Sequence, residues 1–288
     1  MESNVMLSSV SIASIGVTTS ENLSLYHYLS GGKVLRLVLP PEKTNFNCRK
    51  YHICSIYNSN LVALKEFTLN DIKKLIELWK INGIILEGNI SFDLLNNKIV
   101  DMKNNLEVPI GIRTFNPVSN RYADFIIYDY FIDNPVSNSI DTIRFIKDKG
   151  SPWKEIQVYY DEPIFEKFMP IAKSAGESMV PIHVYLLNHR GGKLVKDFYE
   201  QIKELDPYVY IHVELYGEYN TYCPNCGKPV AFREKGVLLS LEVENGKCWN
   251  CKYLLPFYNI ISKKSDKTFV RLTGGDNIWY DPRAVMMK

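Results

Sequence analysis

Four cysteines near the C-terminal end of the chain form two C-x-x-C pairs, Cys223 with Cys226 and Cys248 with Cys251. Each pair places two thiolates on one tight turn, and two such turns can close a tetrahedral four-sulfur site, the geometry that Zn²⁺ accepts. Gly227 follows the first pair and lets backbone amides face the sulfurs. The pattern predicts a zinc site, with a rubredoxin-type iron site and two disulfides as the alternatives.

The residues between the two pairs also fit a zinc ribbon. Residues 230–244 alternate like a hairpin, which is how a ribbon brings its two turns together. We expect this site to stabilise the fold rather than to perform chemistry. Residues 1–19 lack the basic start of a secretion signal, so we expect a cytoplasmic protein, in which thiols stay reduced and paired cysteines bind metal.

The composition sets limits on the class of protein. The chain has 288 residues, of which 46% are hydrophobic and 23% charged, so it can bury a core as one large domain with an appendage. The net charge of +2 excludes a uniformly basic nucleic-acid-binding protein but allows a local basic patch. No apolar run approaches the roughly 18 residues of a membrane span, so we expect no membrane partner. The 19 tyrosines, with plentiful Lys, Ile and Asn, suggest a thermophile.

Strands and helices are expected to alternate along most of the chain. Buried strands are predicted at residues 34–39, 83–86, 108–113, 123–128, 155–160, 180–187 and 209–215, and helices at 69–79, 92–106, 137–149, 164–175 and 193–205. Thr68 is the expected N-cap of the first helix, with Asp71 three residues on. Such alternation predicts an α/β fold with a parallel sheet that curls into a partial or full (β/α) barrel. A doubly wound open sheet is the alternative.

Changes in pattern along the sequence predict four regions. Residues 1–33 form an N-terminal lead-in segment and residues 34–216 the βα barrel. Residues 217–262 form the zinc ribbon, and residues 263–288 a C-terminal basic-aromatic tail.

Three segments together resemble a known family. They are Leu25-Tyr-His-Tyr28 followed by Gly31 and Lys33-Val-Leu35, then Pro181-Ile-His183, and then Gly217-Glu-Tyr-Asn-Thr-Tyr-Cys-Pro-Asn-Cys-Gly227. In this order they resemble the radical SAM enzymes of the AmmeMemoRadiSam system, a branch similar to the pyruvate formate-lyase activating enzyme. The last segment is similar to that family's C-terminal knuckle almost residue for residue. The resemblance covers roughly residues 10–256 and implies a barrel of radical SAM type with a small C-terminal ribbon.

The two motifs that this family needs for catalysis, the cluster-binding cysteines and the S-adenosylmethionine-binding segment, are altered here. The family binds a [4Fe–4S] cluster through three cysteines spaced C-x-x-x-C-x-x-C and leaves one iron open for S-adenosylmethionine. In the corresponding loop only Cys48 remains, because Thr44 and Tyr51 stand at the first and third positions. Cys54 and His52 do not rebuild the set. Ile90 stands where the family has the Glu of its S-adenosylmethionine-binding segment.

The resemblance and these losses together predict a non-catalytic, radical-SAM-like pseudoenzyme. We expect Zn²⁺ as its metal, with no [4Fe–4S] cluster and no S-adenosylmethionine. An active radical SAM enzyme with an atypical cluster is the alternative.

Two basic segments are predicted to bind a partner. The first is a Gly-Gly turn at the start of a helix, and the second is the tail, where basic and aromatic residues mix as in many RNA-binding surfaces. Their candidate residues are Arg190, Lys193, Lys196, Lys263, Lys264, Arg271, Trp279 and Arg283. The predicted partner is RNA or a ribonucleoprotein such as the ribosome. The alternatives are a protein-interaction scaffold or regulator of a related enzyme, a flexible basic turn, and a tail strand that caps the ribbon.

Overall fold

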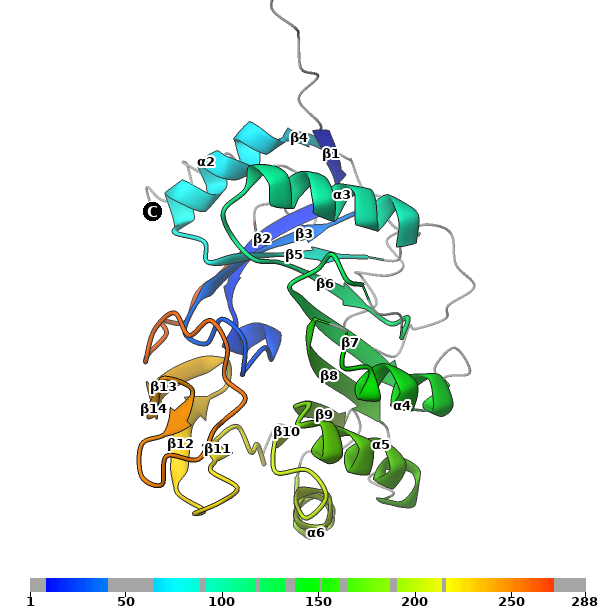
Figure 1. Ribbon diagram of the computed structural model, residues 1–288, viewed down its shortest axis with the longest axis vertical. Coiled ribbons are helices and arrows are strands. Elements are labelled where there is room, and N and C mark those ends of the chain that lie inside the picture. The colour runs from blue at the N-terminus through cyan, green and yellow to red at the C-terminus, as the bar shows by residue number, and fades with distance from the viewer. Residues whose placement is uncertain are drawn as a thin grey trace, which may run out of the picture.

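The structure is a computed structural model that describes residues 9–40, 65–88, 92–117, 120–132, 138–150, 152–160, 165–186, 191–213 and 216–271. It contains a large, mostly parallel sheet with five α-helices on one side and a small module of short strands on the other (Figure 1). Among the described helices, none has the length and apolar character needed to cross a membrane.

The large sheet has nine strands in the order β10-β9-β8-β7-β6-β5-β3-β2-β16. The seven strands from β10 to β3 are parallel, and β2 and β16 add to one end as antiparallel strands. Their bounds are β2 (Ser14–Thr19), β3 (Lys33–Val38), β5 (Gly83–Glu87), β6 (Ile110–Thr114), β7 (Phe125–Phe131), β8 (Trp153–Tyr160), β9 (Ile182–Leu186), β10 (Val209–His212) and β16 (Phe269–Arg271).

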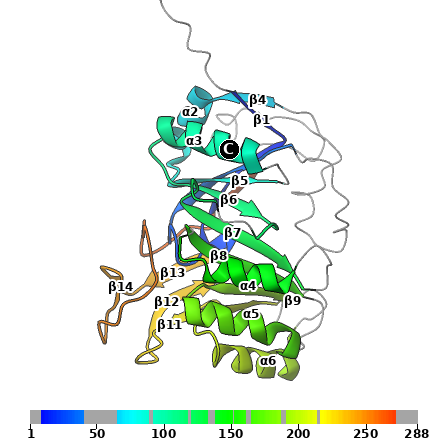
Figure 2. The same ribbon diagram turned by 45° about the vertical axis from the view of Figure 1, so that its right-hand side comes forward.

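Five helices cover the outer face of this sheet, as Figures 1 and 2 show together. They are α2 (Leu69–Trp79), α3 (Phe92–Asn105), α4 (Ser139–Lys147), α5 (Phe165–Ser178) and α6 (Lys193–Lys203). The predicted alternation of seven strands with five helices is confirmed. So is the first cap, since Asp71 N donates to Thr68 Oγ1 at 3.2 Å and Thr68 N donates to Asp71 Oδ2 at 3.0 Å.

The helices leave one gap in the outer layer. Parallel strands β6 and β7 are joined by residues 115–124, and the described part of that connection contains no helix. Such a crossover normally carries a helix, so α3 and α4 lie apart on the outer face (Figure 1).

The described strands do not close into a ring. β10 and β16 lie at opposite ends of the strand order, and no pairing between them occurs in the described residues. The sheet also extends beyond residues 34–216: β2 comes from the predicted lead-in segment, and β16 comes from the predicted tail. Sequence periodicity did not predict either strand.

The two faces of the parallel strands differ in chemistry. Residues on the outer face are apolar and pack under the helices, for example Leu37, Leu86, Ile112, Ile126 and Val158. Between them, alternate residues face the inner side, because successive side chains of a strand point to opposite faces. Several of these inner residues are charged or hydrogen-bonding, and they are buried.

A small unit of residues 219–262 lies on the inner side, and we name it the four-cysteine module. It contains β11 (Thr221–Tyr222), β12 (Pro229–Glu234), β13 (Val237–Leu241), β14 (Val243–Glu244) and β15 (Lys247–Cys248). β12 and β13 form the hairpin that the sequence predicted. A further pair of strands, β1 (Ser9–Ile12) and β4 (Lys65–Thr68), lies beside α2 (Figure 1).

Residues 20–32 separate the module from the sheet, and we call them the inner segment. They include a short 3-10 helix, η1 (Glu21–Leu23), and they pack Leu25 and Leu29 against inner-face residues such as Ile127. The hairpin turn of the module fits closely here. Gly236 has φ +82°, and a Cβ at this position would lie 2.9 Å from Asn22 Oδ1.

Candidate functional site

The two C-x-x-C pairs come together at one end of the module. Cys223 follows β11 and Cys248 ends β15, so the β12–β13 hairpin folds the chain back between them. The sulfur atoms of Cys223 and Cys251 are 3.5 Å apart, and those of Cys226 and Cys248 are 3.8 Å apart. All four sulfurs lie within 4.8 Å of one another and the four thiols are free. The four cysteines therefore form a site that can bind a metal ion, and they are not paired as disulfides.

The surroundings of the four thiols are unequal. Burial raises the pKa of the Cys223 thiol, whereas hydrogen bonds from the Asn225 side chain and the Tyr253 backbone lower the pKa of Cys251. Metal binding needs thiolates, so the polar turn residues around Cys251 favour the form that binds. Beneath the sulfurs, a small apolar core consists of Val230, Ala231, Leu238, Leu241, Val243, Leu255 and Phe257.

A row of alternating charges crosses the inner face of four neighbouring strands. Arg36 on β3 donates to Glu87 on β5 through Nε at 2.8 Å and Nη2 at 3.0 Å. Arg113 on β6 lies 3.6 Å from Glu87 and donates to Asp129 on β7 through Nε at 2.8 Å. Arg113 thus lies between two carboxylates and Arg36 pairs with one, and such pairing is how buried charges are accommodated.

The row continues across β8 through neutral polar groups. Arg113 Nη2 donates to Gln157 Oε1 at 2.6 Å and to the Tyr159 hydroxyl at 2.9 Å. Gln157 Nε2 donates to the carbonyl of Leu23 at 2.5 Å. The inner segment therefore satisfies this network from the other side.

A second buried network surrounds Glu155 on β8. Its carboxylate accepts hydrogen bonds from the backbone N–H groups of Tyr26 and His27, both at 2.8 Å, and from Trp153 Nε1 at 3.2 Å. His183 Nε2 lies 2.9 Å from Glu155 Oε2, and His183 Nδ1 lies 3.1 Å from His212 Nε2. Burial raises the pKa of Glu155 and lowers the pKa values of both histidines well below the usual range. Both imidazoles are therefore neutral near pH 7.

A third chain of hydrogen bonds joins the module to the inner segment and the sheet. His27 Nδ1 lies 3.0 Å from the Pro256 carbonyl oxygen, which only accepts, so Nδ1 carries the proton. Burial lowers the pKa of His27 to about 3, so the ring is neutral and Nε2 accepts from the Tyr210 hydroxyl at 2.6 Å. Tyr210 in turn accepts from Thr221 at 2.7 Å, and Thr221 Oγ1 accepts from Arg233 Nη1 at 2.8 Å. Each hydrogen bond in this series therefore has an assigned donor and an assigned acceptor.

Arg233 also holds the module against the inner segment directly. Its Nη2 donates to the Tyr26 carbonyl at 3.0 Å, and its guanidinium carbon lies 4.2 Å from the centre of the Tyr26 ring. The described inner face is therefore a hydrogen-bonded core that joins the module, the inner segment and the sheet, although Nε of Arg233 has no hydrogen-bond partner among the described residues.

The exposed side of the module has a different character. Seven of the thirteen exposed large hydrophobic side chains among the described residues come from residues 232–261. Around the second cysteine pair, Trp249 is 42% exposed and Tyr253 40% exposed, and Lys247 and Lys252 are exposed beside them. Trp249 Nε1 donates to the Pro229 carbonyl at 3.2 Å, which fixes the edge of the indole and leaves part of the ring open.

The predicted partner-binding residues are not gathered into one surface. Lys193 and Lys196 are exposed in the first turns of α6, and Lys263 and Lys264 are exposed in the segment that follows the module. Arg271 belongs to β16, which pairs with β2 rather than with a strand of the four-cysteine module. The remaining candidates lie outside the described residues: Arg190, Trp279 and Arg283, together with the loop residues Thr44, Cys48 and Tyr51.

Sequence reasoning missed two features that the structure assembles. The charge row of Arg36, Glu87, Arg113 and Asp129 had a signal, because each residue interrupts an apolar strand at an inward position. The exposed Trp249 and Tyr253 had one too, since both flank the second cysteine pair.

Comparisons with protein-family models, with curated proteins and with solved structures find no match to this chain. The resemblance to radical SAM enzymes therefore rests on the sequence segments alone.

Proposed function

We propose that this chain is a non-catalytic RNA-binding protein whose four-cysteine module holds Zn²⁺ and presents the RNA-binding surface. The observation that carries the proposal is the half-exposed indole of Trp249, whose Nε1 bonds the Pro229 carbonyl, close in sequence to exposed Tyr253 and Lys247 and to Lys252, which lies 3.7 Å from Glu244. Aromatic faces stack on unpaired bases and lysines contact phosphates, so this combination suits single-stranded RNA, free or in a ribonucleoprotein such as the ribosome.

The sulfur geometry supports a tetrahedral metal site, and the two C-x-x-C pairs on tight turns favour zinc as its metal. With Zn–S bonds of about 2.3 Å and tetrahedral angles, the sulfurs of a four-cysteine site are about 3.8 Å apart. The distances of 3.5 and 3.8 Å fall close to that value. With zinc bound, the module is a zinc ribbon that holds Trp249 and Tyr253 in place from below.

The inner face supports the non-catalytic part of the proposal. In a barrel enzyme, the catalytic side chains come from the C-terminal ends of the strands, the position that Glu87 occupies on β5. Here Glu87, Asp129 and Glu155 bond with other side chains and with the inner segment. On this proposal the chain is a radical-SAM-like partial barrel whose interior serves stability and whose module binds the partner. The presence of Thr44 and Tyr51 where the resemblance implies cluster cysteines also supports a non-catalytic protein.

A protein partner is the second candidate. Leu254 is 67% exposed and Leu239 47% exposed on the same module, and such side chains are used in protein interfaces more than in RNA contacts. A scaffold or regulator of a related enzyme would use these two leucines.

A fluorescence-anisotropy titration with labelled single-stranded RNA tests the proposal. Because stacking on an aromatic ring contributes about 1–3 kcal/mol per base, Trp249→Ala and Tyr253→Ala should each weaken binding at least fivefold. The matched control is Tyr122→Ala, because Tyr122 is an exposed tyrosine outside the four-cysteine module. This variant should bind RNA like the parent. Two lysine–phosphate contacts predict a shallow salt dependence, with a slope of about −1.4.

Two results would contradict the RNA assignment. One is parent-like binding by the Trp249→Ala and Tyr253→Ala variants. The other is no RNA binding by the parent together with capture of a protein that Leu254→Ser releases, which would favour the scaffold.

A further inference from the structure

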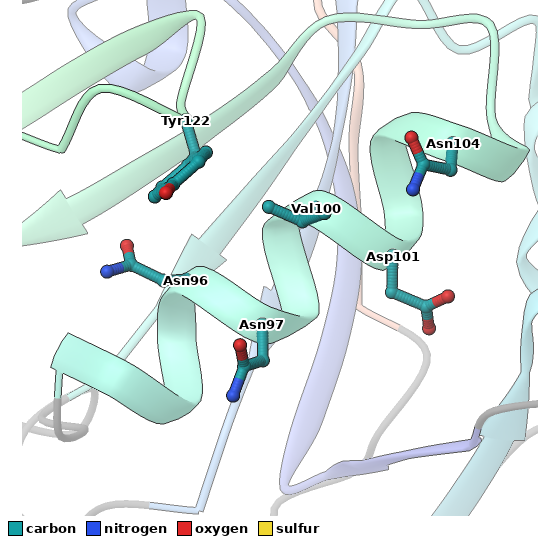
Figure 3. A pocket seen from close by; sticks show the side chains of 6 residues that line it. All are labelled: Asn96, Asn97, Val100, Asp101, Asn104 and Tyr122. Carbon is teal, nitrogen blue, oxygen red and sulfur yellow. The ribbon is translucent and has the colours of Figure 1, made fainter.

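The gap in the outer helix layer contains a cavity of about 710 Å³, far from the four-cysteine module in both sequence and fold. It lies beside α3, next to the connection between β6 and β7 that contains no helix in its described part. Its volume is within the range of roughly 300–1,000 Å³ typical of small-molecule sites. The lining residues are Asn96, Asn97, Val100, Asp101, Asn104 and Tyr122 (Figure 3).

The lining side chains share one chemistry, which is neutral hydrogen bonding. The amides of Asn97 and Asn104 each carry donors and an acceptor, Asn96 keeps its donors while its Oδ1 accepts from Asn120 at 2.8 Å, and Asp101 adds carboxylate acceptors. Residues 97, 100, 101 and 104 occupy one face of α3, because side chains three and four positions apart on a helix are neighbours. A ligand with several hydroxyl groups, each both donor and acceptor, matches this pattern.

Tyr122 adds an aromatic surface opposite the helix. Figure 3 shows its ring facing α3 near Asn96 and Val100. The side chain is 51% exposed, but its backbone is held, since Tyr122 N donates to Asn120 Oδ1 at 3.0 Å and its carbonyl accepts from Lys103 Nζ at 3.1 Å. A half-exposed ring on a hydrogen-bonded backbone can pack against the C–H face of a hydroxylated molecule.

The charges argue against an anionic ligand. None of the six described lining residues is cationic. The neighbouring Lys103 is tied to Asp124 at 2.7 Å, and Asp101 would repel a phosphate or carboxylate.

We propose that this cavity binds a neutral sugar, with the ring of Tyr122 packing on the sugar face and the amides of Asn97 and Asn104 bonding its hydroxyl groups. The site is independent of the RNA-binding proposal, and either can fail without the other. The same chemistry would serve a free monosaccharide or the end of a glycan chain.

Saturation-transfer NMR with the full chain tests this site. The probes are glucose, galactose, mannose, N-acetylglucosamine and their neutral oligomers, with inorganic phosphate and choline as charged comparisons. We expect saturation of sugar ring protons, and loss of one hydrogen bond in Asn97→Ala or Asn104→Ala should weaken binding about fivefold, equivalent to about 1 kcal/mol. Tyr122→Ala should weaken it tenfold or more. Tighter binding of oligomers identifies a glycan end, and equal binding identifies a free sugar.

Two control variants test whether the loss of sugar binding is specific to the cavity. Asn70→Ala removes an exposed asparagine from α2, and Tyr253→Ala removes an exposed tyrosine from the module, so both should bind sugar like the parent. The altered side chains are surface residues, and circular dichroism should show the parent fold for every variant. Absence of saturation transfer to every sugar, parent-like binding by Tyr122→Ala and Asn104→Ala, or displacement by phosphate or choline would each overturn the proposal.

Discussion

The Nε2 atom of His27 lies 2.6 Å from the hydroxyl oxygen of Tyr210, and this contact joins the inner segment to an edge strand of the sheet directly beneath the four-cysteine module. Tyr210 is bonded to Thr221 of the module, so one hydroxyl group links three parts of the chain. Because the imidazole must be neutral to accept this bond, the packing of the module depends on the protonation of one buried histidine.

Acid should therefore weaken the fold through His27. Burial lowers its pKa to about 3 from an ordinary value of 6.5, so the unfolded chain takes up the proton first, and stability is lost as the pH falls from about 6.5 towards 3. The variant His27→Gln does not titrate. Between pH 7 and pH 4.5 the free energy of unfolding of the parent, measured in urea, should fall by about 2–3 kcal/mol more than that of the variant. Equal slopes in parent and variant would contradict the neutral state of buried His27.

Asp206 should have the opposite pH dependence. It is fully buried after α6, with Oδ1 accepting from Tyr208 N and Oδ2 without a described partner, and burial raises its pKa to about 8. Its folded pKa lies above its unfolded value of 3.8, so stability is lost as the pH rises from about 4 to 8. Asp206→Asn should be more stable than the parent by at least about 1 kcal/mol at pH 8, with the advantage gone near pH 4. An unchanged midpoint in urea at pH 8 would show that the carboxyl is not buried as described.

The chain should bind one Zn²⁺ through the four cysteines. Cys223→Ser or Cys251→Ser should lose the metal and unfold the module, because an open site leaves thiolates without a cation. Plasma mass spectrometry of the purified protein measures the metal, and a change in tryptophan fluorescence, to which Trp249 is one of four contributors, follows unfolding of the module. The matched control Cys54→Ser removes a thiol outside the module and should keep full zinc content. A preparation with iron, or with no metal and disulfides among these cysteines, would contradict the zinc assignment.

Radical SAM chemistry should be absent. Where the resemblance would place two cluster cysteines and a glutamate, this sequence has Thr44, Tyr51 and Ile90, so we expect protein purified without oxygen to be colourless and to form no 5′-deoxyadenosine from S-adenosylmethionine and a strong reductant. An active enzyme of that family, treated in parallel, is the control. A near-stoichiometric [4Fe–4S] cluster with 5′-deoxyadenosine formation would restore the enzyme interpretation.

Local sequence patterns predicted the elements of the main fold. Apolar runs such as residues 83–86 and the Thr68–Asp71 cap depend on neighbours along the chain, and both are confirmed. β16 was not predicted because a three-residue strand has no period of its own and forms only by pairing with β2.

The buried networks could be predicted only in part. Arg113 and Asp129 are 16 residues apart, and the sequence shows that each interrupts a strand but not that the strands are neighbours in register. The basic tail was expected either to bind a partner or to form a strand that caps the ribbon; in the structure Ser265 bonds to Leu238 of β13, and Arg271 lies in the large sheet. Exposure of Trp249 likewise depends on how the hairpin folds and not on its place beside Cys248.

Affinity purification of the tagged chain from cells, with bound RNA sequenced and bound protein identified, tests the central claim most directly. The parent should retain RNA or a ribonucleoprotein, nuclease treatment should release it, and the Trp249→Ala, Tyr253→Ala double variant should retain at least tenfold less while keeping its zinc. The double variant Tyr122→Ala, Asn70→Ala should behave like the parent. Retention of a nuclease-resistant protein partner with no RNA, or equal RNA recovery by the parent and the module variant, would contradict the account.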